Sequence, residues 1–173
     1  FRRASDFLAS LPCKQALVIP GNHDIPLYHL FARFFTPYRH YEAAFRTREY
    51  HVRMPGVYFL GLDATSPSRH KNGYLDPVAL EAALVKARAA MGPEDMLIVS
   101  AHQPLVVAMV RDEENILIDA DSTAALFARY KVDMVLSGHV HFPLITTSAA
   151  AYPRLAHRFI LSGAGTAVSA RIR

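Results

Sequence analysis

Three short, mainly apolar runs at residues 16–19, 96–99 and 133–136 constrain the fold more than any other feature of the sequence. Each run is followed by a loop that contains histidine. A short apolar run bounded by turn residues is typical of a strand that is covered on both faces of a sheet. Helix-length segments separate the runs. The sequence therefore predicts an α/β fold, with a sheet whose strand ends carry polar side chains.

Periodicity and turn residues predict the remaining elements. Asp76 and Pro77 begin a segment whose apolar positions keep helical spacing as far as Met91. Pro55-Gly56 joins two strand-like segments and predicts a hairpin. The predicted elements are helices at 2–11, 76–91 and 122–130, two short helices within 27–45 separated at Pro37, a hairpin of 49–54 and 57–62, a loop at 64–76, and strands at 158–161 and 167–172.

Composition excludes several classes of protein. The 173 residues are 51% apolar and 20% charged, as expected for one globular domain that buries a core. The net charge is +4, and the basic residues are scattered with no run longer than Arg2-Arg3, so a nucleic-acid partner is not expected. The longest apolar runs, of about six residues, are too short to span a bilayer, and no membrane partner is expected. The single cysteine, Cys13, cannot form an internal disulfide, which favours a cytoplasmic location.

The loops that follow the three apolar runs carry residues that bind metals. His23 follows the first run, His102 the second, and His139 with His141 the third, while Asn22 precedes His23. The carboxyl ends of strands line the binding crevice of open α/β sheets, so these loops could converge. Imidazole and amide oxygen are suitable ligands for a divalent cation. In an extended segment, His139 and His141 would face the same side, and Gly138 would allow close backbone approach.

Each of these residues also has an ordinary interpretation. Most histidines in globular chains are surface or core residues with a satisfied hydrogen bond. Asn22 beside Gly21 could equally form a simple turn, and Asp24 could cap the following helix. Histidines outside the strand-end loops are interpreted in this ordinary way; they are His29, His40, His51, His70 and His157.

Taken together, three motifs resemble a known family. Pro20-Gly21-Asn22-His23-Asp24, Ser100-Ala101-His102-Gln103-Pro104 and Ser137-Gly138-His139-Val140-His141 resemble, in order and spacing, motifs of the calcineurin-like metallophosphoesterases. The closing Gly163-Ala164-Gly165-Thr166-Ala167, with Ser169 and Arg171, is similar to the branch that includes cyclic-nucleotide phosphodiesterase-like enzymes. The resemblance spans residues 17–173 and implies a core of two sheets flanked by helices.

The resemblance implies metal-dependent hydrolysis of phosphodiesters or phosphomonoesters. Two divalent ions, of manganese, iron or zinc, would lie at the sheet edge. Asn22, His102 and His139 would bind one ion, and His141 would bind the other. His23 would be the catalytic acid that protonates the leaving oxygen. The implied substrate is a small-molecule phosphate ester or a nucleotide.

The sequence departs from the family pattern upstream of Asn22. The family has an Asp-x-His element and a Gly-Asp element before this point, and neither is present here. We therefore expect residues 1–173 to be a single domain that is incomplete at both ends and holds one ion or none. The alternative is a non-catalytic module that binds a metal or a partner. Uncovered sheet edges would favour a homo-oligomer.

Overall fold

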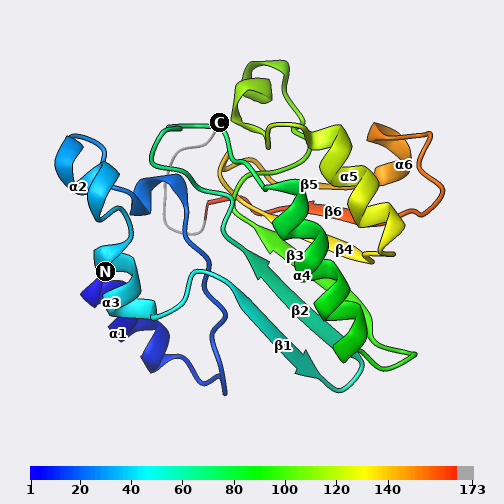
Figure 1. Ribbon diagram of the computed structural model, residues 1–173, viewed down its shortest axis with the longest axis horizontal. Helices are drawn as coiled ribbons and strands as arrows, with labels where there is room; N and C mark the ends of the chain where they lie inside the picture. Colours follow the sequence, from blue (N-terminus) through cyan, green and yellow to red (C-terminus); the bar gives the residue numbers. More distant parts are fainter. Residues whose placement is uncertain (167–173) are drawn as a thin grey trace.

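One mixed sheet organises the fold (Figure 1). The structure is a computed structural model and describes residues 1–166. Its strand order is β1-β2-β3-β4-β6-β5, with β2, β3, β4 and β6 parallel and the edge strands β1 and β5 antiparallel to their neighbours. The strands are β1 (Tyr50–Met54), β2 (Val57–Leu62), β3 (Met96–Ala101), β4 (Met134–Ser137), β5 (Leu144–Thr147) and β6 (Ile160–Gly163). The α/β prediction is confirmed, and the described residues contribute one sheet of the two that the resemblance implies.

Two helices cover one face of this sheet. Figure 1 shows α4 (Pro77–Ala90) and α5 (Ala120–Arg129) lying across the same face. Leu84 and Phe127 from these helices pack in one buried cluster with Val99 of β3. The start of α4 is the predicted one: the Asp76 carboxylate accepts hydrogen bonds from the backbone N–H groups of residues 78 and 79. Burial of this aliphatic and aromatic face supplies the main core of the fold.

The opposite face of the sheet is less completely covered. The cross-strand row Val52, Phe59, Ile98, Met134 and Ile160 lies on this face, and each of these side chains is half-buried or exposed. Leu17 and Ile19 line a cavity together with Tyr50, Ser100 and Leu136, near the carboxyl ends of the parallel strands.

The strand predicted at residues 16–19 is wrong. The run is irregular and pairs with no strand among the described residues. An apolar run requires burial, but a strand also requires a neighbouring backbone with which to exchange hydrogen bonds. Here Leu17 and Ile19 are half-buried along a cavity that sheet residues also line, and the backbone joins no ladder. The strand predicted at 167–172 lies outside the described residues.

Residues 1–48, which we call the N-terminal lobe, lie to one side of the sheet (Figure 1). The lobe holds α1 (Arg2–Ser10), the 3-10 turn η1 (Asn22–Asp24), α2 (Leu30–Phe35) and α3 (Arg39–Phe45), which confirms the two short helices predicted around Pro37. Phe1 meets the rings of His40, Tyr41 and Phe45, and so joins the start of α1 to α3.

Two further helical segments lie between the strands. These are η2 (Val110–Asn115) and α6 (Ser148–Ala151), and the sequence patterns predicted neither. Among residues 1–166, none of the helices is long and apolar enough to cross a bilayer.

Candidate metal centre

The candidate site lies where the lobe meets the carboxyl ends of β3 and β4. Asn22 and His23 come from η1, His102 directly follows β3, and His139 comes two residues after β4. Two hydrogen bonds close the η1 turn. The Asp24 carboxylate accepts from the Gly21 N–H at 2.7 Å, and the Gly21 carbonyl accepts from the Asp24 N–H at 3.0 Å. The prediction that Asp24 caps the following helix is wrong: His29 caps α2, and the Asp24 carboxylate is used within its own turn instead.

His102 contacts both Asn22 and His139. His102 Nε2 lies 3.1 Å from Asn22 Oδ1 and 3.2 Å from His139 Nδ1. The Asn22 amide is oriented by its own Nδ2, which donates to the His70 carbonyl at 2.9 Å. Because Nδ2 is used in this way, Oδ1 is left facing the imidazoles. Segments separated by up to 117 residues therefore place one amide oxygen and one imidazole nitrogen within 3.2 Å of His102 Nε2.

Gly21, and not Gly138, permits the close packing at this point. A β-carbon on Gly21 would lie 2.8 Å from His102 Cε1, inside van der Waals contact. A β-carbon on Gly138 would meet nothing within 4 Å. The expectation that Gly138 permits close backbone approach is therefore wrong. The glycine that makes room for His102 is Gly21, in the loop that carries Asn22.

The segment that carries His139 and His141 is bent. β4 ends at Ser137, and both histidines have left-handed backbone conformations, with φ of 70° and 59°. This conformation is costly for residues other than glycine and is concentrated at functional sites. The prediction of an extended segment is wrong, because the chain turns directly after the strand. His139 is half-buried beside His102, whereas His141 is exposed.

Burial keeps the two contacting imidazoles neutral near pH 7. It is the main cause that lowers the pKa of His102 and the pKa of His139 from 6.5 to about 4. The charges of His23 and His141 are smaller contributions to the same lowering of both pKa values. A neutral imidazole retains the nitrogen lone pair with which it coordinates a cation.

The arrangement of donors fits one divalent cation. Ligands about 2.1 Å from such an ion, at tetrahedral or octahedral angles, lie about 3.0 to 3.4 Å apart. The two donor separations seen here, 3.1 and 3.2 Å, fall within that range. Within residues 1–166, no group of three or more His, Cys, Asp or Glu side chains is arranged to hold a metal. The candidate set differs from such groups because an amide replaces one charged or imidazole ligand.

His23 and His70 lie at the exposed margin of the site. Their ring centroids are 6.4 Å apart, and the rings are perpendicular. The sequence interpretation gave His70 an ordinary role, yet its carbonyl orients Asn22 and its ring faces His23. The one signal for it was its position in the predicted loop at 64–76, a segment long enough to shape a site.

Three of the other histidines to which the sequence gave no metal-binding role make ordinary structural hydrogen bonds. His29 accepts from the Ala32 N–H at the start of α2, His51 contacts the Tyr58 hydroxyl, and His157 contacts the Val132 carbonyl. None of these three contacts involves a residue of the candidate metal centre.

Comparison with known proteins assigns the chain to a family. No curated protein matches the chain. Residues 2–143 match the sequence model of the calcineurin-like phosphoesterases, and this match covers more than half of the chain and all four loop histidines. The chain belongs to the calcineurin-like phosphoesterase family.

Proposed function

We propose that this chain carries a metal-dependent phosphoesterase site in which Asn22, His102 and His139 hold one divalent cation. The spacing of Asn22 Oδ1, His102 Nε2 and His139 Nδ1 is the observation that carries the proposal. Family membership supports the reaction class, because phosphoesterases of this kind depend on divalent metals. Manganese, iron and zinc all accept imidazole and amide ligands.

The residues around the cation position have separate roles in this proposal. A bound cation supplies neutralisation of the phosphoryl oxygens and activates water for in-line attack. His23, exposed on η1, donates a proton to the leaving oxygen. His141 lies exposed outside this donor set, so the second ion that the resemblance implies is left with one imidazole, and we expect only the first ion to be retained. The His70 carbonyl holds the Asn22 side chain in its ligating orientation.

The proposed substrates are small-molecule phosphodiesters or phosphomonoesters, with nucleotides among them. The similarity to the cyclic-nucleotide phosphodiesterase-like branch supports a diester. That similarity includes Ser169 and Arg171, which lie outside the described residues.

A second candidate function is a non-catalytic metal-binding module. The composition of the donor set favours it, because the set contains no carboxylate to balance the charge of two cations. The Asp-x-His and Gly-Asp elements of the family are also absent from these 173 residues. This candidate predicts retention of one cation without turnover.

Metal binding and turnover, measured on the same variants, test both candidates. We expect calorimetric titration with Mn²⁺ or Zn²⁺ to give one site per chain. His102→Ala and His139→Ala should each weaken binding at least about tenfold, since loss of one ligand removes a large part of a small donor set. His157→Ala is the matched control, because that ring bonds only to the Val132 carbonyl.

Turnover of bis-p-nitrophenyl phosphate and of p-nitrophenyl phosphate is then measured with added Mn²⁺. Turnover that His23→Ala reduces without loss of metal supports the enzyme. A bound ion with no turnover of either ester supports the module. Equal metal affinity in His139→Ala and His157→Ala contradicts both candidates.

A further inference from the structure

The polarity of α2 is reversed relative to an ordinary surface helix. Its one buried residue is Arg33, whose guanidinium donates to the Pro26 carbonyl at 3.1 Å and to the Arg69 carbonyl at 2.9 Å. Surface helices usually bury an apolar stripe and expose charge. Here hydrogen bonds from a cation attach the helix to the protein, and its apolar side chains point outward.

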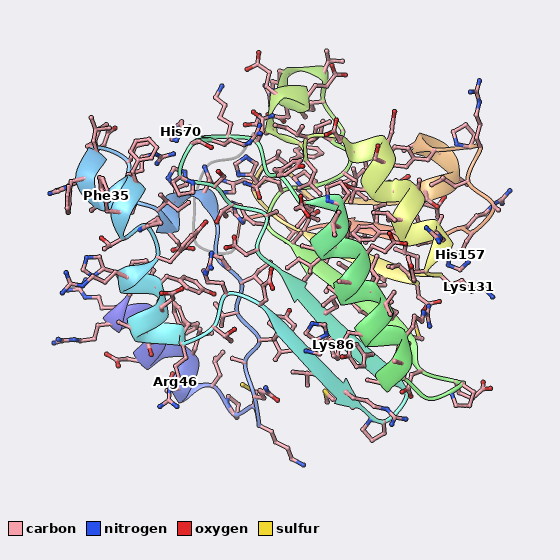
Figure 2. The ribbon with its side chains drawn as sticks, in the orientation of Figure 1. Phe35, Arg46, His70, Lys86, Lys131 and His157 are labelled. Carbon is pink, nitrogen blue, oxygen red and sulfur yellow. The ribbon has the colours of Figure 1, made fainter. Side chains whose placement is uncertain are left out.

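The outward side chains form a dense apolar surface. We call Tyr28, Leu30, Phe31, Phe34 and Phe35 the α2 aromatic face; these residues are 56% to 92% exposed. Phe31 and Phe35 stack on each other with ring centroids 4.7 Å apart. Figure 2 shows Phe35 at the outer margin of the lobe, away from the sheet. Isolated exposed apolar residues are common, but five within eight positions indicate a surface that is covered in use.

The charge of the chain is concentrated in the same lobe. Residues 1–48 contain seven Lys or Arg and three Asp or Glu, whereas residues 49–173 contain twelve of each. The lobe therefore carries the entire net charge of +4. Five of its basic side chains are exposed, namely Arg2, Arg3, Lys14, Arg39 and Arg46. Arg39 begins α3, only four residues after the end of α2.

We propose that the α2 aromatic face docks on the surface of an anionic lipid bilayer. Aromatic side chains on a short helix enter the boundary between headgroups and acyl chains, and nearby cations are attracted to acidic headgroups. The net positive charge of the lobe is the complementary feature that favours this occupant. Such docking is peripheral and requires no helix that spans the membrane.

Docking in this manner would bring the candidate metal centre close to the lipid surface. Arg33 ties α2 to the carbonyl of Arg69, the residue before His70. Figure 2 places His70 on the loop next to the lobe. A bilayer that receives α2 therefore lies near the margin of the site where His70 faces His23.

Sedimentation with vesicles tests the proposal independently of any phosphoesterase activity. The full chain is mixed with vesicles of phosphatidylcholine alone, or of equimolar phosphatidylcholine and phosphatidylglycerol. We expect binding to the anionic vesicles to be at least about tenfold stronger. The triple variant Phe31→Ser, Phe34→Ser, Phe35→Ser should lose at least about tenfold of that binding. The matched control, Val78→Ser, Val110→Ser, Ile145→Ser, removes three equally exposed apolar side chains elsewhere and should bind as the parent does.

A fluorescent reporter supplies a second measurement. The chain contains no tryptophan, so Phe35→Trp introduces a single probe on α2, and Ile145→Trp introduces one on β5. We expect anionic vesicles to shift the emission of the α2 probe to shorter wavelength and to leave the β5 probe unchanged.

Three results would overturn the proposal. These are binding to neither type of vesicle, equal binding to both types, and unchanged binding by the α2 triple variant. If that variant loses self-association in light scattering while the parent binds no vesicles, the α2 aromatic face is an interface between two copies of the chain. Circular dichroism of each variant confirms that loss of binding does not reflect loss of folding.

Discussion

The sheet face beneath α4 and α5 and the N-terminal lobe bury different kinds of side chain. The sheet face buries aliphatic and aromatic groups such as Leu84, Val99 and Phe127 almost completely. The lobe buries Ile25 and Tyr41, but it also buries the guanidinium of Arg33 and leaves the Tyr41 hydroxyl without a hydrogen-bond partner among the described residues, while its phenylalanines on α2 are exposed. The comparison indicates that the sheet face supplies most of the stability and that the lobe supplies an exposed apolar surface and one of the three donors of the candidate metal centre, Asn22.

The largest expected effect tests the division of stability between these two regions. Phe127→Ala removes a fully buried ring from the sheet face and should lower the free energy of unfolding by about 3 to 5 kcal/mol. Phe35→Ala, the matched change in the lobe, should alter it by less than about 0.5 kcal/mol. Urea unfolding of both variants measures the difference. Similar losses in the two variants would show that the lobe is part of the core.

The next effect tests the junction between the two regions. Gly21→Ala places a β-carbon against His102 and should cost about 1 to 3 kcal/mol of stability while weakening metal binding. Gly138→Ala is the control, because open space surrounds its added methyl group. Thermal unfolding and Mn²⁺ titration are measured on both proteins. If Gly138→Ala is the more damaging change, the packing described at the junction is incorrect.

A smaller effect is expected from the turn that carries Asn22. Asp24→Ala removes the acceptor for the Gly21 N–H and should cost about 0.5 to 2 kcal/mol, as for other capping residues. Asp6→Ala on α1 is the control, since that carboxylate is exposed. The comparison is made by urea unfolding. A stability loss in Asp6→Ala as large as in Asp24→Ala would argue against a special role for the η1 turn.

The smallest effect concerns the pH dependence of the sheet face. Burial, followed by the charge of Lys86, lowers the pKa of His51, whose ring contacts the Tyr58 hydroxyl. As pH falls through the ordinary histidine value of 6.5, the unfolded chain takes up this proton first, so stability falls with it. His51→Gln should remove this contribution, and Lys86→Gln should reduce it. Unfolding free energies measured between about pH 7.5 and 5.5 give the slopes. His102 and His139, whose pKa values are also lowered, contribute to the slope in every variant, so the test is the difference between His51→Gln and the parent, and no difference would exclude a contribution from His51.

Local sequence signals were sufficient to predict the helices and the hairpin whose formation depends on residues within the same segment. The hairpin at Pro55-Gly56, the capped start of α4 and the two short helices on either side of Pro37 all formed as predicted. β5 and α6 escaped prediction because Leu144–Thr147 becomes a strand only by pairing with β6, and Ser148–Ala151 is a single helical turn. The run at 16–19 shows the converse case, in which strand-like residues lack a partner strand.

The sequence by itself determined the donor types at the candidate site and the two strands, β3 and β4, that precede its histidines. It placed Asn22, His102 and His139 directly after short apolar runs, and it carried the motifs that resemble the family. Tertiary structure decided how these groups meet. The Asn22 amide is oriented by a carbonyl 48 residues away, and His139 turns toward His102 through a left-handed backbone. Tertiary structure also decided that α2 presents its aromatic rings to solvent, because Arg33 finds its carbonyl partners only after the chain has folded. Contacts between distant segments depend on the whole packing, and no local pattern of residues encodes them.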